Sequence, residues 1–205
     1  TQRIIAGEFD SHFLVDMIQG GAGTSCNMNM NEVIANIGLE SMGYKKGQYS
    51  FLHPNSHVNM SQSTNDVYPT AIRLAIHLKE ESLLDAIRRL INAFSKKADQ
   101  FKDISKLART QLQDAVPMTL GQEFNSFSST LRQEVILLKS MSELLNSINL
   151  GGTAVGTGIN TKKGYSKLAI NALISLTSID FKPADDFFDA SSDMGAFVIY
   201  SSSLK

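Results

Sequence analysis

The chain has 205 residues, of which 42% are hydrophobic and 19% are charged, and its formal net charge is −1. This composition is typical of a globular protein, and the scattered Lys and Arg residues give no electrostatic basis for binding nucleic acid. No apolar run approaches the roughly 18–20 residues that a membrane-spanning helix needs. The single cysteine, Cys26, excludes an intrachain disulfide and fits a reducing compartment. We therefore expect a cytoplasmic protein that binds neither nucleic acid nor membranes.

Residues 1–66 are predicted to form the C-terminal part of a small N-terminal domain. A glycine-bearing segment, 20–25, precedes a helix-like run, and a polar segment, 61–66, ends the domain. The helix-like run passes through Val33, Ile34 and Ile37. His53 and His57 have the spacing of two metal ligands on one helix face, but the intervening proline argues against a helix and no third ligand is evident. We expect no metal site there.

Residues 67–205 are predicted to be part of a long-helix bundle, so the chain as a whole is expected to be mainly α. Apolar residues recur at spacings of three and four in two long segments, which places one apolar stripe along each helix. The first stripe is formed by Ala71, Leu78, Leu83, Ile87, Leu90, Phe94, Ala98 and Phe101. The second is formed by Leu120, Phe124, Phe127, Leu131, Val135, Leu138, Met141, Leu145 and Ile148.

Two prolines and two weaker patterns complete the predicted helices. Pro69 and Pro117 are each expected in the first turn of a long helix, where a missing N–H is tolerated. The second helix would then extend for about 30 residues from Pro117, or roughly 45 Å. Shorter helices are predicted over 166–177 and 190–205, and the segment 109–114 joins the two long helices.

The connecting segments are rich in neutral hydrogen-bond donors. Such donors beside helix starts and glycines suit a small carboxylate, because free N–H groups and the helix dipole favour anions there. The donors are Thr24, Ser25, Ser63, Thr64, Asn65, Thr110, Gln111 and Asn160. Plainer interpretations stay open. The run 63–66 also fits a helix N-cap, and the glycines of 20–23 fit a tight turn that lacks the dinucleotide-binding fingerprint.

Three of these segments together resemble the aspartase/fumarase superfamily. The segment 20–29 is similar to the family's first substrate loop, 61–66 to its second, and 151–160 to its glycine-rich segment after the long helix. The resemblance implies homotetramers built around a central bundle of long helices, with each active site shared between three subunits. The substrate-binding residues that it implies are Thr24, Ser63, Thr64, Asn65, Thr110 and Gln111, with Asp66 and Asn160 as further candidates.

Details within the superfamily favour its aspartase branch, whose members eliminate ammonia from L-aspartate to give fumarate. The stretch 109–118 resembles aspartases, and class II fumarases carry a histidine where Gln111 stands, although some aspartases do so too. A Ser-Thr pair at 63–64 and the absence of a histidine from 190–193 favour the same branch.

Other assignments stay open. Ser56 stands where the superfamily usually has an acidic residue beside His57, so the role of these two positions, including any secondary anion site, is undetermined. A class II fumarase or another lyase of the superfamily is one alternative function. A non-catalytic helical scaffold is another, but it does not account for donor-rich segments in family order.

The resemblance also implies a mechanism. A proton leaves the carbon beside a carboxylate, and fixed donors stabilise the resulting enediolate, so no cofactor is expected; activation by magnesium cannot be read from the sequence. The family's proton-abstracting serine lies on a loop that has no match in these 205 residues, and the serines 201–203 are not equivalent to it. Both chain ends look cut. We therefore expect a fragment that lacks the family's C-terminal domain and has no ammonia-lyase activity by itself.

Overall fold

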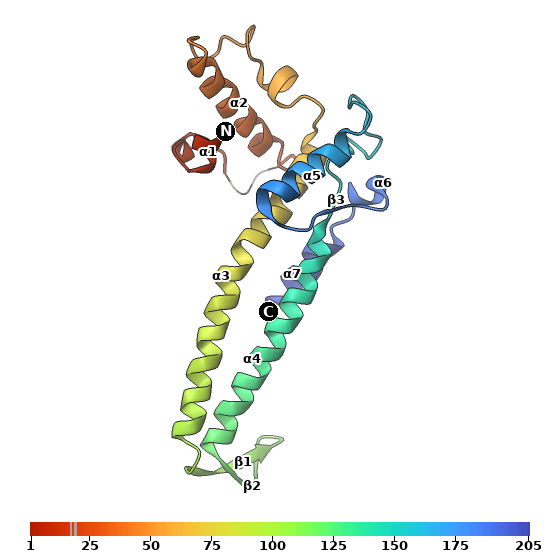
Figure 1. Cartoon of the computed structure of the whole chain (residues 1–205). Helices are drawn as coiled ribbons and strands as arrows, with labels where there is room; N and C mark the ends of the chain where they lie inside the picture. The colour runs from red at the N-terminus through yellow and green to blue at the C-terminus, as the bar shows by residue number, and fades with distance from the viewer. Residues whose placement is uncertain (17, 19) are drawn as a thin grey trace. The chain divides into compact units, whose positions relative to one another are not determined.

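The long apolar-striped segments form helices, and the structure is mainly α, as predicted (Figure 1). The computed structural model describes residues 1–16, 18 and 20–205. The chain divides into two compact units: unit 1 comprises residues 1–74 and 146–194, and unit 2 comprises residues 75–145 and 195–205. The domain boundary predicted at residue 66 stays a prediction. In the described part of the chain, no helix combines the length and apolar character needed to cross a membrane.

Unit 1 is built from short elements around the first residues of α3. Its elements are α1 (Gln2–Ile5), η1 (Asp10–His12), α2 (Thr24–Ser41), η2 (Pro54–Val58), the start of α3 (Thr64–Gln100), β3 (Ser147–Ile148), α5 (Tyr165–Thr177), β4 (Lys182–Pro183) and α6 (Phe187–Ala190). Strands β3 and β4 pair in parallel. Ile148, Ile170 and Phe181 are buried together and form the apolar core of this unit. The helix predicted over 166–177 is confirmed as α5.

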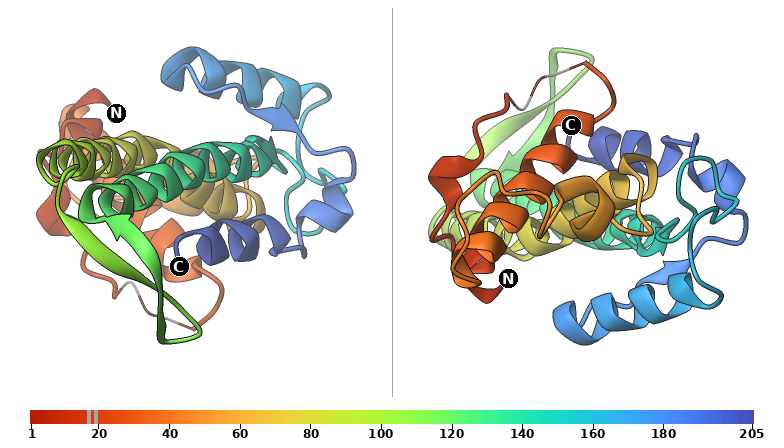
Figure 2. Two further views of the ribbon diagram at one scale, coloured as in Figure 1. Left: turned by 90° about the horizontal axis from the view of Figure 1, so that it is seen from below. Right: turned by 90° about the horizontal axis from the view of Figure 1, so that it is seen from above.

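Unit 2 is a helical arm that ends in a hairpin. Its elements are the rest of α3, β1 (Ser105–Thr110), β2 (Gln113–Thr119), α4 (Leu120–Ser142), most of η3 (Glu143–Asn146) and α7 (Gly195–Ser203). Leu84, Leu138, Leu145 and Tyr200 form a buried cluster that joins α3, α4 and α7. Helix α7 packs on α4 (Figure 2). The helix predicted over 190–205 is confirmed for the residues of α7, but a separate short helix, α6, ends at Ala190.

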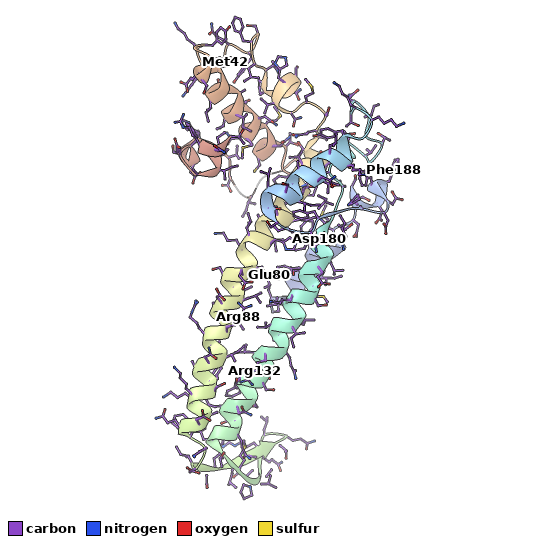
Figure 3. All side chains as sticks on the ribbon, viewed as in Figure 1. Met42, Glu80, Arg88, Arg132, Asp180 and Phe188 are labelled. Carbon is purple, nitrogen blue, oxygen red and sulfur yellow. The ribbon has the colours of Figure 1, made fainter. Side chains whose placement is uncertain are left out.

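Helices α3 and α4 pack closely because small residues face each other. The hydroxyls of Ser95 and Ser128 lie 2.9 Å apart, and Arg132, labelled in Figure 3, donates to Ser95 Oγ at 3.0 Å. A Cβ atom at Gly121 would lie 2.5 Å from the carbonyl oxygen of Ala98, so only glycine allows this approach. The two predicted stripes also pack against one another, since the ring of Phe94 contacts those of Phe124 and Phe127.

The start of the second long helix was predicted wrongly. Pro117 lies in β2, and α4 begins at Leu120 with Thr119 as its N-cap. Thr119 Oγ1 accepts from the Gln122 N–H at 3.2 Å, and Gln122 Oε1 accepts from the Thr119 N–H at 2.9 Å. This reciprocal capping box fixes the helix start. Proline is tolerated in β2 because both strands of a two-stranded ribbon are edge strands.

Pro69 also lies elsewhere than predicted, since α3 begins at Thr64 and contains Pro69 beyond its first turn. A proline there cannot donate to the carbonyl of Asn65, four residues earlier. Asn149 supplies the missing donor: its Nδ2 lies 3.0 Å from the Asn65 carbonyl oxygen. This long-range contact satisfies the carbonyl that Pro69 leaves without a donor, so α3 can begin upstream of Pro69, at Thr64.

The segment 109–114 is the end of a β-hairpin that the sequence did not predict. Strands β1 and β2 pair antiparallel, with Thr110 opposite Gln113. The two residues between them, Gln111 and Leu112, have φ values of 48° and 63°. Positive φ at both central positions is the property of a type I′ turn, which glycine and asparagine usually provide. Neither residue type is present, so the usual turn signal is missing.

Candidate active site

The start of α3 carries three of the predicted substrate-binding residues. Ser63 Oγ accepts from the Asn65 N–H at 3.3 Å, and the Ser63 N–H donates to Asp66 Oδ1 at 3.0 Å. The N-cap that the sequence suggested for this run is therefore confirmed. Because Ser63 Oγ acts as an acceptor in this cap, and no hydrogen bond among the described residues uses its proton, that proton can still be donated to an anion.

Asp66 joins the start of α3 to the glycine-rich segment. Its side chain is fully buried (0% exposed), and Oδ2 accepts from the N–H groups of Gly151 at 3.0 Å and Thr153 at 2.9 Å. Asn65 Nδ2 adds a further link by donating to the Ala154 carbonyl at 2.7 Å. Two segments that are more than 80 residues apart in the chain are thereby held as one assembly.

The start of α2 lies against the same part of α3. Gly23 has a φ of 87°, and a Cβ atom there would lie 2.3 Å from the ring of Tyr68. Glycine is therefore required at this position both for its backbone conformation and for the close approach. Thr24 follows it as the first residue of α2, is exposed, and donates its hydroxyl proton to the Gly21 carbonyl at 2.9 Å.

A network of three asparagine amides, two of them buried, lies behind these residues, and the sequence interpretation missed its role. Asn27 Nδ2 donates to Thr64 Oγ1 at 3.0 Å and to Asn59 Oδ1 at 3.3 Å. Asn31 Nδ2 donates to Asn59 Oδ1 at 3.1 Å and to Asn27 Oδ1 at 3.2 Å. The available signal was the spacing of Asn27 and Asn31, four residues apart, which places two amides on the buried face of one helix.

The remaining predicted residues fall into two groups. Asn160 is exposed with a φ of 66°, and its carbonyl accepts from Ser61 Oγ at 3.4 Å, so it lies with the residues of unit 1. Thr110 and Gln111 belong to unit 2, where they are exposed at the end of the hairpin. The structure thus links Ser63, Thr64, Asn65 and Asp66 directly to α2 and the glycine-rich segment, and it places Thr110 and Gln111 in the other unit.

Unit 1 also contains a buried cation. Arg73 is 7% exposed; burial lowers the pKa of its guanidinium, and the negative charge of Asp193 opposes that effect. Since a guanidinium remains protonated in proteins, Arg73 is a fixed positive charge on α3. Asp193 lies in the stretch 190–193, whose lack of a histidine favours an aspartase over a fumarase. This stretch therefore interacts electrostatically with Arg73 on α3.

The two histidines of 53–57 are used in local backbone contacts. His53 Nδ1 accepts from the N–H groups of Asn55 and Ser56, both at 3.1 Å, and His57 Nδ1 accepts from the His53 N–H at 2.8 Å. Within residues 1–16, 18 and 20–205, no group of three His, Cys, Asp or Glu side chains is placed to hold a metal ion.

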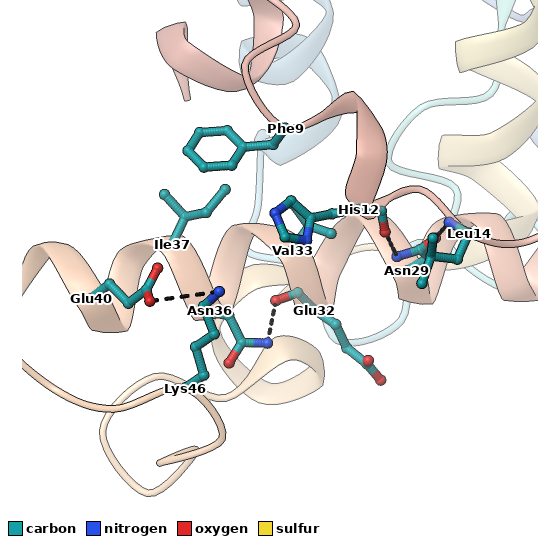
Figure 4. Close-up of a pocket in the computed structure, with 10 residues that line it drawn as sticks. All are labelled: Phe9, His12, Leu14, Asn29, Glu32, Val33, Asn36, Ile37, Glu40 and Lys46. Atoms are coloured by element: carbon teal, nitrogen blue, oxygen red, sulfur yellow. Dashed lines mark hydrogen bonds and ion pairs between the residues drawn. The ribbon is translucent and has the colours of Figure 1, made fainter.

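A separate pocket of about 240 Å³ lies in unit 1 (Figure 4). Its lining includes Phe9, Val33 and Ile37, together with the ion pair of Glu40 and Lys46 at 3.6 Å. None of the predicted substrate-binding residues lines it. The largely apolar wall does not resemble the donor-rich segments, and we do not assign the pocket to the candidate site.

Comparisons with known proteins find relatives over nearly the whole chain. The chain is 57% identical over 204 residues to the aspartate ammonia-lyase of Pseudomonas aeruginosa, and 54% identical over 199 residues to that of Escherichia coli. These alignments cover 99% and 97% of this chain but only 43% and 42% of the relatives. The chain therefore spans less than half the length of the curated relatives that it matches.

Solved structures give the same result for the fold. A fumarate lyase (delta crystallin) from Brucella melitensis matches with a TM-score of 0.96 and 51% identity, over 99% of this chain and 44% of that one. A class II fumarase from Schistosoma mansoni matches with a TM-score of 0.88 and 34% identity, over 98% of this chain and 46% of that one. The expected aspartase/fumarase fold is thus confirmed. A family model described as Lyase matches residues 1–205, and the chain belongs to this lyase family.

Proposed function

We propose that this chain is part of an aspartate ammonia-lyase, which converts L-aspartate reversibly to fumarate and ammonia. The observation that carries the proposal is the donor cluster at the start of α3, where Ser63 and Thr64 both have hydroxyl protons that no described residue accepts. The relatives named aspartate ammonia-lyase, at 54–57% identity, support this reaction over hydration of fumarate.

The proposed reaction requires groups that stabilise a developing negative charge. A base removes a proton from the carbon beside one carboxylate of aspartate, and the electron pair moves into that carboxylate as an enediolate. The C–N bond then breaks, ammonia leaves, and the electron pair returns to form the double bond of fumarate. Fixed O–H and N–H donors stabilise the intermediate charge, each by about 3–4 kcal/mol, and the start of a helix adds its dipole. This chemistry requires no metal or organic cofactor.

We further propose that the site is shared between subunits of a homotetramer. Thr110 and Gln111 would contact the substrate from a neighbouring copy. The exposed apolar side chains of unit 2 support such an assembly, because burial against another copy would remove them from water. Leu112 beside Gln111 is 97% exposed, Ile136 on α4 is 70% exposed, and Leu78 on α3 is 64% exposed.

The base is not assigned to any residue of this chain. In the family it is a serine on a flexible loop, and no segment among these 205 residues resembles that loop. Because the chain spans 43% of the Pseudomonas aeruginosa relative, a chimera can supply the rest: this chain would replace the matching segment of that enzyme. We expect the chimera to release ammonia and fumarate from L-aspartate, measured by absorbance of fumarate.

Substitution within this chimera tests the assigned roles. Thr110→Val should lower turnover by about 10²–10³-fold, the usual effect of removing one donor to a developing anion. Thr130→Val is the matched control, since Thr130 is exposed on α4 and donates only to the Ser126 carbonyl of its own helix. Full turnover by Thr110→Val would refute the role. Hydration of fumarate without amination would favour the fumarase alternative.

A further inference from the structure

We infer that Asn27 is a positioning residue that fixes the Thr64 hydroxyl as a proton donor toward the substrate carboxylate. This inference rests on the proposed function. It concerns a side chain that does not itself contact the substrate, since Asn27 is only 7% exposed and its amide is used by neighbouring protein groups.

The direction of the Thr64 hydroxyl follows from its single contact with Asn27. A hydroxyl has one proton to donate and two lone pairs to accept. Asn27 Nδ2 lies 3.0 Å from Thr64 Oγ1, and an amide nitrogen can only donate, so Thr64 is the acceptor in this contact. No described residue accepts the Thr64 proton. That proton therefore points away from Asn27 and is available to an anion at the start of α3.

Two further amides hold Asn27 in this orientation. Asn31 is 4% exposed, and its Nδ2 donates to Asn27 Oδ1 at 3.2 Å and to the Asn27 carbonyl at 2.9 Å. Asn59 Oδ1 accepts from both Asn27 and Asn31, at 3.3 and 3.1 Å, and Asn59 Nδ2 donates to the Gln62 carbonyl at 3.4 Å. If the Asn27 amide were turned over, its nitrogen would face the nitrogen of Asn31. The network thus selects one orientation of the amide.

Orientation of this kind matters because an unrestrained hydroxyl samples three staggered positions. Donors that already point to the place where charge develops need no reorganisation during the reaction. Buried supporting residues commonly provide that restraint for groups that contact a ligand. Thr24 gives an internal comparison: its hydroxyl donates to the Gly21 carbonyl, and no described side chain holds it toward a ligand.

A double-mutant cycle in the chimera tests the inference. Asn27→Ala should lower kcat on the order of tenfold with a smaller effect on KM, as expected for loss of one restraining hydrogen bond. In a Thr64→Val background, which has no hydroxyl to orient, the same substitution should change kcat by less than about twofold. Asn36→Ala is the matched control, because Asn36 lies on the same helix but bonds to Gly47 and Tyr49. It should leave kcat unchanged.

Asn27→Asp separates orientation from packing. The substitution preserves shape but places a carboxylate oxygen beside Asn59 Oδ1, so a purely structural role predicts the same loss of kcat with and without the Thr64 hydroxyl. The carboxylate also accepts the Thr64 proton and turns it away from the substrate, so our inference predicts a much smaller loss from Asn27→Asp in the Thr64→Val background than in the unsubstituted chimera. Independent effects of Thr64→Val and either substitution at Asn27 would overturn the inference while the proposed function stands. An assembled but inactive unsubstituted chimera would overturn the proposed function and this inference with it.

Discussion

Replacing the buried carboxylate of Asp66 by an amide should destabilise unit 1 strongly. Asp66 accepts three backbone N–H groups, from Ser63, Gly151 and Thr153, at 2.9–3.0 Å. An amide has one acceptor oxygen, so Asp66→Asn must turn its NH₂ group toward at least one of these donors. A hydrogen bond to a charged group contributes about 1.5–3 kcal/mol, and a buried donor left without a partner costs a similar amount. We therefore expect a loss of about 3–5 kcal/mol in the free energy of unfolding.

Hydrogen exchange can measure this loss at the two loop amides themselves. The N–H groups of Gly151 and Thr153 should exchange slowly in the wild-type chain and much faster in Asp66→Asn. Asp186→Asn is the control, because Asp186 also accepts two N–H groups at a helix start but is exposed to solvent. Its effect should be only about 0.5 kcal/mol, because asparagine caps an exposed helix start about as well as aspartate and only the interaction of the charge with the helix dipole is lost. If both substitutions destabilised the chain equally, the reasoning from burial would be refuted.

Three further outcomes follow from the structure. Asn149→Ala should lower the free energy of unfolding by about 1 kcal/mol in the wild-type chain but less in Pro69→Ala, where residue 69 regains an N–H for the Asn65 carbonyl; urea denaturation of the double-mutant cycle measures the difference. Burial, and then the charge of Glu80, raise the pKa of Tyr200 above its usual 10.0, so its contribution to stability is complete below pH 10.0 and falls as the pH rises through the folded-state pKa. Tyr200→Phe should remove this alkaline loss in melting temperatures compared at neutral pH and above pH 10.0. The 205-residue chain by itself should release no ammonia from L-aspartate, and sustained release in a coupled assay would contradict the assignment of the base to another segment.

Periodicity was sufficient to predict the long helices but not their starts. The apolar stripes depend only on local spacing, and they do pack around residues such as Leu84 and Leu138. Pro117 was placed in a helix because a proline before an apolar stripe is typical of a helix start. It lies in a hairpin whose turn, Gln111–Leu112, lacks the glycine or asparagine that would have indicated it. Thr119 and Gln122 have the spacing of a capping box, so the sequence did contain a signal for the true start of α4.

The sequence indicates those features of the candidate site that depend on neighbouring residues. It does not indicate the contacts between residues that are far apart in the chain. Ser63, Thr64 and Asn65 are consecutive and were named from their own chemistry. Two of the three partners of Asp66, Gly151 and Thr153, lie more than 80 residues away, so no local pattern shows that its carboxylate holds a loop. Asn149 was missed for the same reason, because its contact compensates for a proline in another element.

The chemistry of the buried groups explains why the hydroxyl donors at the start of α3 are left available. Asp66 can only accept, so it binds backbone N–H groups at the helix start and in the glycine-rich segment. Asn27 presents an N–H to Thr64, and the Asn65 N–H donates to Ser63, so both hydroxyls act as acceptors toward the protein. Each hydroxyl then keeps its proton for donation to a ligand. Recognition of a dicarboxylate at this place would therefore depend on which groups accept inside the protein, and a change from donor to acceptor at position 27 would reverse it without altering the shape of the site.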